Sequence, residues 1–297
     1  MGGRDLRVHV ALLAAQLSFG GFHVVAKALL ADLHPLVLAG ARVLVAAPLL
    51  LLFAWRRDRV VPSRRDLPLL ALLGFLGVFA NQVLFIVGLD HTTATNAAIL
   101  MASIPVFAVG VGALSRAEGI GPRRLLGLGL AVLGTLVVLD PGRFALESEA
   151  FLGNALILLN CLSYAIFLVL HRPALARLPW RTVLAWAFVF GGGAVTVLAA
   201  PWLAAFRPAA VPAGVWAGLA YVVLFATVLA YSWNTWAVRR SSATLVAAYT
   251  TLQPLVAAVL AAVFLGEELH WRQGLGFALI AGGLWRVSLR PPRAATG

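Results

Sequence analysis

Ten apolar runs constrain this chain more than any other feature of its sequence. A membrane-spanning helix needs roughly 20 apolar residues, and only helices or closed barrels satisfy every backbone hydrogen bond in lipid. The runs lack the alternating pattern of a barrel strand, and only 11% of all residues are charged. The sequence therefore predicts an all-α membrane protein with ten transmembrane helices. The predicted spans are 8–31, 36–55, 67–89, 94–115, 123–139, 152–171, 181–203, 213–236, 243–265 and 272–289.

The basic residues predict how these helices are oriented. Lysine and arginine concentrate on the cytoplasmic side of membrane proteins. If the N-terminus lies inside, the inside segments hold eighteen of the 23 basic residues. We therefore expect an inner-membrane protein with both termini in the cytoplasm. Because the net charge of +12 is scattered between apolar runs, the expected partner is the lipid bilayer and not nucleic acid.

An internal repeat relates the two halves of the chain. A shift of 149 positions aligns the fourth and fifth runs with the ninth and tenth without a gap. Each half holds five runs, so the second half must enter the membrane in the opposite direction. We predict two inverted five-helix repeats, at residues 1–145 and 146–297. The matching pairs include Thr95 and Thr244, Pro105 and Pro254, Glu118 and Glu267, Arg123 and Arg272, and Gly134 and Gly283.

The repeated segments also carry a resemblance to a known family. Each half has a Pro-centred helix, a Glu in the following loop and a Gly-rich last helix, in segments that begin at Gly88 and Leu265. In this respect the chain resembles the EamA family of the drug/metabolite transporter superfamily over nearly its whole length. The resemblance implies a ten-helix carrier, often an exporter of amino acids or related metabolites, with a central cavity between the halves.

Polar side chains inside the spans are candidates for a substrate site. Such groups are costly in lipid, so each should face a cavity or a partner helix. The alternative for each of them is an interhelical hydrogen bond. His23 shares a helical stripe with Gln16 and with Lys27, which we expect at the outer membrane interface. The ten candidates for binding a polar or zwitterionic solute are His23, Asn81, Gln82, Asn96, Ser103, Asn160, Tyr164, Tyr231, Tyr249 and Gln253.

Three further residues stand out within the spans. Arg42 lies deep in the second span without an evident acidic partner. It either meets an anionic group or snorkels to the ends of neighbouring helices. Pro105 and Pro254 occupy equivalent positions near the middle of their spans, and each removes one helical hydrogen bond. We predict a hinge at both prolines, with a static bend as the alternative.

The chemistry of common enzyme motifs is missing from the sequence. There is no Walker A loop, His-Glu-x-x-His or Gly-x-Ser-x-Gly motif, and the chain has one cysteine, Cys161. We expect no enzymatic activity, no cofactor, no metal and no disulfide. The favoured function is a secondary carrier that exports small amphipathic metabolites by alternating access. The alternatives are a lipid or hydrophobic-drug translocase of the same fold, and a non-transporting scaffold or intramembrane enzyme. The expected partners are a small-molecule substrate and the bilayer, with the chain as a monomer or a homodimer.

Overall fold

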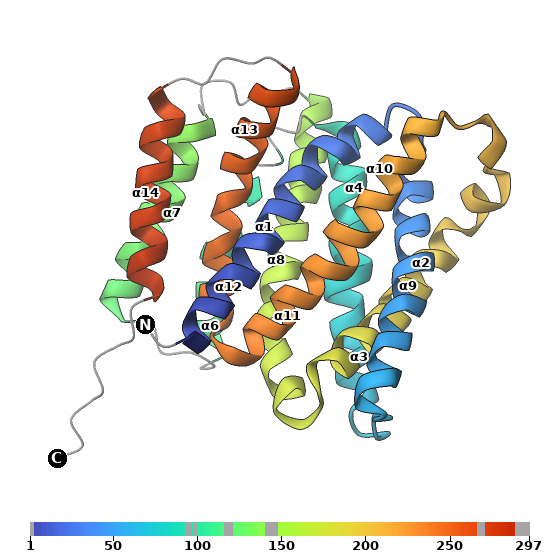
Figure 1. Cartoon of the computed structure of the whole chain (residues 1–297), viewed down its shortest axis with the longest axis horizontal. Coiled ribbons are helices and arrows are strands. Elements are labelled where there is room, and N and C mark those ends of the chain that lie inside the picture. The colour runs from blue at the N-terminus through green and yellow to red at the C-terminus, as the bar shows by residue number, and fades with distance from the viewer. Residues whose placement is uncertain are drawn as a thin grey trace.

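The chain forms a bundle of helices (Figure 1). The computed structural model describes residues 3–92, 97, 100–101, 103–115, 121–139, 148–265 and 271–288, and these ranges contain no strand. The first half contains α1 (Gly3–Leu29), α2 (Pro35–Asp58), α3 (Leu67–Gly74), the π-helical η1 (Phe75–Ala80), α4 (Asn81–His91), α6 (Ser103–Leu114) and α7 (Pro122–Leu139). The second half contains α8 (Ser148–Arg177), α9 (Trp180–Ala205), the 3₁₀ turn η3 (Pro208–Ala210), α10 (Ala213–Val223), the π-helical η4 (Leu224–Leu229), α11 (Ala230–Arg240), α12 (Ala243–Tyr249), the 3₁₀ turn η5 (Thr250–Leu252), α13 (Gln253–Leu265) and α14 (Trp271–Ser288).

Six helices in the described part of the chain are long and apolar enough to cross a membrane. They are Leu6–Leu29, Pro35–Asp58, Leu67–His91, Phe151–Arg177, Trp180–Ala205 and Ala213–Arg240. Four shorter apolar helices lie within the remaining predicted spans, at Ser103–Gly112, Leu125–Gly134, Ala243–Ala257 and Gly274–Gly283. The chain is therefore a multi-pass membrane protein. The predicted boundary between residues 145 and 146 falls in 140–147, outside the described residues.

The 149-residue repeat extends to the helix boundaries. α7 begins at Pro122 and α14 at Trp271, and each helix spans 18 residues. The π segments η1 and η4 also begin 149 positions apart, at Phe75 and Leu224. Equivalent helices pack together as two pairs, α7 with α14 and α2 with α9. The packing is reciprocal elsewhere as well, because α8 contacts α4 and α6 while α1 contacts α11 and α13.

Three of the predicted spans are interrupted helices and not continuous α-helices. Spans 67–89 and 213–236 each contain a six-residue π segment, η1 or η4. Such segments are rare and occur frequently at functional sites. Span 243–265 is divided by the 3₁₀ turn η5, and Pro254 follows as the second residue of α13. A proline cannot donate a backbone hydrogen bond, so it fits the first turn of α13, where that donor would be unpaired. Pro105 likewise lies in the first described turn of α6.

Glycines bring the paired helices into direct backbone contact. A Cβ atom added at Gly134 in α7 would lie 2.7 Å from the carbonyl oxygen of Gly276, and one at Gly283 in α14 would lie 2.5 Å from that of Gly127. Gly191 in α9 is still closer to α3, because its Cβ would lie 2.1 Å from the carbonyl oxygen of Gly74. Small residues permit this approach of helices in membranes.

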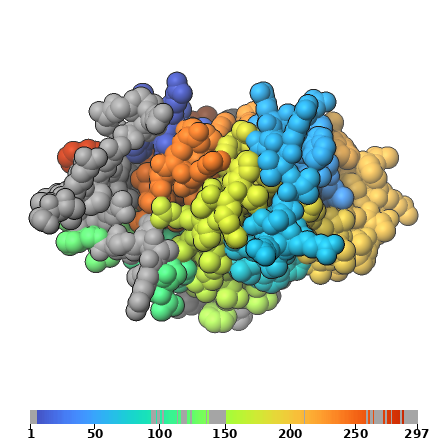
Figure 2. Space-filling view, turned by 90° about the horizontal axis from the view of Figure 1, so that it is seen from below, coloured from blue at the N-terminus to red at the C-terminus, as the bar shows by residue number. Residues whose placement is uncertain are grey.

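The two ends of the bundle differ. α1 begins and α14 ends at the lower end in Figure 1, where α8 and α11 also end. The segment between α2 and α3 and the last turns of α8 and α11 lie at this lower end, and these parts of the chain contain Arg59, Arg64, Arg65, Arg177, Arg239 and Arg240. Figure 2 shows the lower face, where α8 occupies the centre between α11 on one side and α2 and α3 on the other.

Candidate functional site

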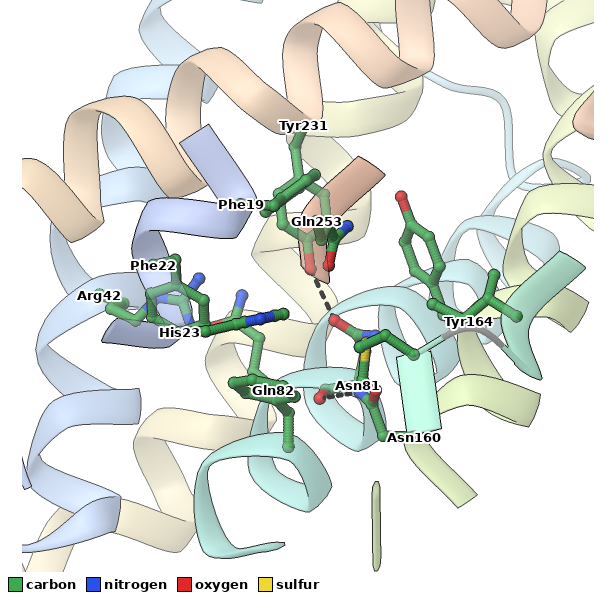
Figure 3. Close-up of a pocket in the computed structure, with 13 residues that line it drawn as sticks. Phe19, Phe22, His23, Arg42, Asn81, Gln82, Asn160, Tyr164, Tyr231 and Gln253 are labelled. Atoms are coloured by element: carbon green, nitrogen blue, oxygen red, sulfur yellow. Dashed lines mark hydrogen bonds between the residues drawn. The ribbon is translucent and has the colours of Figure 1, made fainter. Parts of the chain in front are cut away.

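A cavity of about 50 Å³ lies between the two halves of the chain. Figure 3 shows Arg42, Phe22 and His23 on one side, Asn160 and Tyr164 on the other, and Tyr231 and Gln253 above. The described side chains that line it are Phe19, Phe22, His23, Arg42, Asn81, Gln82, Phe85, Met101, Ile104, Asn160, Tyr164, Tyr231 and Gln253.

Seven of the ten predicted site residues meet at this cavity. They come from α1, α4, α8, α11 and α13, which belong to both halves of the chain. The structure brings these side chains together, and their role in binding a substrate stays a prediction. The seven are His23, Asn81, Gln82, Asn160, Tyr164, Tyr231 and Gln253.

Three predicted residues do not join them. Ser103 donates its hydroxyl to the carbonyl of Leu100 at 2.7 Å and does not line the cavity. Tyr249 instead pairs its hydroxyl with Nδ1 of His9 at 2.5 Å. The four-residue spacing places Tyr249 and Gln253 on one helical face only if the helix is regular. The intervening turn η5 has about 3 residues per turn instead of 3.6, so the two side chains diverge. Asn96 lies outside the described residues.

α1 supplies one wall of the cavity through its helical spacing. Phe19, Phe22 and His23 recur at i, i+3 and i+4, so they share one face of the helix. Gln16, one turn before this group, is fully buried and lies on the same stripe. Gly20, one turn after Gln16 on the same stripe, allows α13 to approach, because an added Cβ would lie 2.5 Å from Cβ of Val256.

Two chains of hydrogen bonds hold the amides and phenols in place. Tyr231 donates its hydroxyl to Oδ1 of Asn81 at 2.7 Å, and Nδ2 of Asn160 donates to the carbonyl oxygen of Asn81 at 2.5 Å. These bonds join α4, α8 and α11 on one side of the cavity.

The second chain involves residues that were not predicted as ligands. Nε2 of Gln253 donates to Oε1 of Gln16 at 2.7 Å. Nδ2 of Asn234 donates to the hydroxyl oxygen of Tyr164 at 2.8 Å. The interhelical hydrogen bonds expected as the alternative role are therefore present for Asn81, Asn160, Tyr164, Tyr231 and Gln253, while the same side chains also line the cavity.

Arg42 points into the cavity and does not snorkel to a membrane edge. The residue is only 2% exposed, its Nε donates to Oγ1 of Thr227 at 3.1 Å, and its guanidinium carbon lies 4.2 Å from the ring centre of Phe22. The Thr227 hydroxyl donates in turn to the carbonyl of Val222 at 2.7 Å. Among the described lining residues there is no acidic side chain to balance the charge of Arg42.

Polar atoms of two other lining residues have no hydrogen-bond partner in the described part of the chain. They are Nδ1 of His23 and both side-chain polar atoms of Gln82. His23 is 2% exposed and Gln82 is 1% exposed. Buried polar groups are nearly always paired in proteins, so unpaired ones call for a ligand, a water molecule or an ion. These atoms lie on the side of the cavity that also holds Arg42 (Figure 3).

Sequence reasoning missed the apolar lining of the cavity. The missed lining residues, besides Arg42, are Phe19, Phe22, Phe85, Met101 and Ile104. Apolar side chains in a membrane protein carry no signal that separates cavity from lipid or core. The one usable signal was spacing, because Phe19 and Phe22 lie four and one positions before His23.

At the upper end of the bundle in Figure 1, hydrogen bonds join α1, the end of α4 and α8. Nζ of Lys27 donates to the carbonyl oxygens of Leu89 at 2.8 Å and Thr92 at 2.9 Å. The Thr92 hydroxyl also donates to Oδ1 of Asn154 at 2.8 Å. Lys27, which we expected at the membrane interface, therefore also caps the C-terminal end of α4, since cations are favoured at helix C-termini.

The lower end of the bundle is hollowed. A space of about 650 Å³ lies beside the ends of α8 and α11, and its lining includes the side chains of Arg172 and Arg239. These helices meet on the face shown in Figure 2. The other described lining residues are Ser115, Val169, Leu170, Pro173, Leu175, Ala176 and Val238.

Comparisons with known proteins agree on one family. The family described as the EamA-like transporter family matches residues 6–140 and again residues 151–289. Protein WALLS ARE THIN 1 of Arabidopsis thaliana is 29% identical over 95% of this chain and 82% of its own length. A protein named "Uncharacterized transporter" from Archaeoglobus fulgidus is 29% identical over 96% of this chain and 98% of its own. The inner membrane transporter YedA of Escherichia coli K12, also named as uncharacterized, is 27% identical over 94% and 90%.

One solved crystal structure shares the fold. It superposes with a TM-score of 0.74 and covers 96% of both chains. The sequences are 18% identical, so this match supports the architecture alone.

Proposed function

The chain belongs to the EamA-like transporter family and is a membrane transporter rather than an enzyme, and from this premise we propose a specific mode of transport. The protein is a secondary carrier that moves small amphipathic metabolites, such as amino acids, by alternating access between two inverted five-helix repeats. The six long and four shorter apolar helices act as ten spans. Export is the proposed direction, in keeping with the family resemblance.

The reciprocal packing of the two halves supports this mechanism. α1 packs on α11 and α13, and α8 packs on α4 and α6. Two related halves can exchange their conformations and expose a site between them to either side in turn. The equivalent π segments η1 and η4 flank the cavity and give both halves the same local irregularity.

The cavity between the halves is the observation that carries the proposal. Its lining combines amide, phenol and guanidinium groups with aromatic rings, which suits a solute with polar and apolar parts. The hydrogen bonds across the upper end and the hollow at the lower end support a carrier that is open to one side. With the basic lower end in the cytoplasm, this conformation is open inward, and both termini are cytoplasmic.

Transport by purified protein in proteoliposomes tests the proposal. Liposomes loaded with a pool of amino acids and related metabolites should exchange a labelled member of that pool. Gln253→Leu should reduce the exchange at least several-fold, because Gln253 lines the cavity. Ser103→Ala is the matched control, since Ser103 lies outside the cavity, and it should leave the exchange nearly unchanged.

Three results would contradict the carrier. Equal exchange by the two variants would remove the cavity from the transport path. Movement of labelled lipid without movement of any solute would instead favour a lipid translocase of the same fold. The absence of any flux would favour a non-transporting scaffold.

A further inference from the structure

We propose that the cavity recognises a solute that carries one carboxylate on an apolar, preferably aromatic, body. Arg42, His23 and Gln82 bind the carboxylate, and the aromatic side chains enclose the body. This inference rests on the proposed carrier function, because it names the substrate class of the same site.

The charge of Arg42 is the first step of the argument. An ionisable side chain within a membrane span marks a functional site by default, and a buried cation requires a partner. Its contacts are the hydroxyl of Thr227 and the face of the Phe22 ring, and neither carries a negative charge. The bond to Thr227 uses Nε, and no hydrogen bond to a described residue occupies the two terminal amino groups. Those two groups form the fork that binds a carboxylate through two parallel bonds.

Two neighbouring donors extend the same subsite. The amide nitrogen of Gln82 and Nδ1 of His23 are buried without a hydrogen-bond partner among the described residues. The His23 ring is held by stacking on Phe85 at 5.3 Å between ring centres, which fixes its orientation toward the cavity. An anion that accepts from Arg42 and from these donors would satisfy buried groups that otherwise lack partners.

The repeat indicates that the fold does not need a cation at this position. Arg42 in α2 corresponds to Gly191 in α9 by the 149-residue shift, and Thr227 corresponds to Val78. In that equivalent place the helices touch directly, because a Cβ on Gly191 would lie 2.7 Å from Cβ of Val78. The same helix contact is therefore built once from apolar residues, Gly191 and Val78, and a second time with a charged side chain, Arg42, against Thr227. Only the second arrangement leaves a cavity with an unbalanced charge.

The rest of the cavity selects the apolar body of the solute. Phe19 meets Tyr231 edge to face at 5.6 Å, and Phe22 lies 5.5 Å from Phe85. Paired rings of this kind form walls that suit another ring or a branched aliphatic chain. A single guanidinium matches a single carboxylate better than a doubly charged phosphate, which would remain partly unpaired.

The lower hollow fits the entry of an anion. Arg172 and Arg239 line it, and a cleft with positive charge concentrates anionic solutes. No described acidic side chain lines either space.

Equilibrium binding by the purified full-length chain tests the inference. The probes are 3-phenylpropanoate and its uncharged counterpart 3-phenylpropanamide, and the readouts are calorimetric titration and the ligand-induced rise in melting temperature. We expect the carboxylate to bind at least about tenfold more tightly than the amide, because hydrogen bonds to a charged partner are the stronger ones. Arg42→Met should abolish this preference. Arg207→Met, the same change on an exposed loop residue, should retain it.

Arg42→Met should fold, because the change removes a buried charge that has no counter-ion. If it does not fold, the comparison of the two probes on the unaltered chain still decides. Equal affinity for the two probes would overturn the inference, and so would a carboxylate preference that survives Arg42→Met.

The outcome is separable from that of the carrier proposal. Solute exchange in proteoliposomes without any carboxylate preference would leave the carrier standing and overturn the subsite. Arg42-dependent binding of 3-phenylpropanoate without flux of any solute would leave the subsite standing and overturn the carrier.

Discussion

The three consecutive glycines of α9 allow a graded test of the helix packing. A Cβ at Gly191 would lie 2.1 Å from the backbone oxygen of Gly74, whereas one at Gly192 would lie 3.3 Å from Cβ of Val43. At Gly193 nothing lies within 4 Å. Substitution by alanine therefore adds the same methyl group to one helix in a forbidden, a tight and an open environment.

The expected changes in stability follow from two opposing effects. Alanine favours a helix over glycine by up to about 1 kcal/mol, and overpacking costs about 1–3 kcal/mol. Because the obstacle at Gly191 is backbone that cannot rotate away, the upper figure applies there, and Gly191→Ala should lose ~2 kcal/mol net. Gly192→Ala should be nearly neutral, since Val43 needs to move only slightly. Gly193→Ala should gain up to ~1 kcal/mol.

Cys161 provides the assay. It is the only cysteine of the chain and is fully buried, so a thiol-reactive fluorophore reports its exposure as the protein is heated. With roughly 2 °C per kcal/mol for a chain of this size, Gly191→Ala should melt about 4 °C below the unaltered protein. Gly193→Ala should melt at the same temperature or slightly above it. If Gly191→Ala melted together with Gly193→Ala, the close backbone contact between α3 and α9 would be refuted.

Three other changes have defined outcomes. Lys27→Met removes the bonds to the carbonyls at the end of α4, so hydrogen exchange at 85–92 should accelerate, and unchanged exchange would argue against a seal there. Hydrogen bonds from Ser63 hold the pKa of Asp66 below its ordinary value, with a smaller effect of the Arg177 charge. This stabilisation is present above the ordinary carboxyl pKa and lost as pH falls through the lowered one, so Asp66→Asn should melt with a weaker acid dependence. Tyr231→Phe loses the bond to Asn81 and should lower stability by about 1 kcal/mol, measured by the same thiol assay.

The sequence by itself determined the class of the protein and most of the polar side chains of its site. Membrane spans are set by local composition, because the bilayer demands long apolar helices whatever their neighbours are. The 149-residue repeat and the family resemblance follow from residue identity alone. Polar side chains within the spans stand out against the apolar residues that the bilayer requires. Seven of the ten side chains predicted on this basis meet at the cavity.

Only the tertiary structure decided which of those side chains face one another. The π segments η1 and η4 and the 3₁₀ turn η5 change the helical phase, and the change at η5 separates Tyr249 from Gln253. Whether Arg42 pairs or snorkels depends on what the neighbouring helices present, here Thr227 from η4 and Phe22 from α1. Spacing along one helix fixes a direction around its own axis, whereas the distance to another helix depends on packing between segments far apart in the chain.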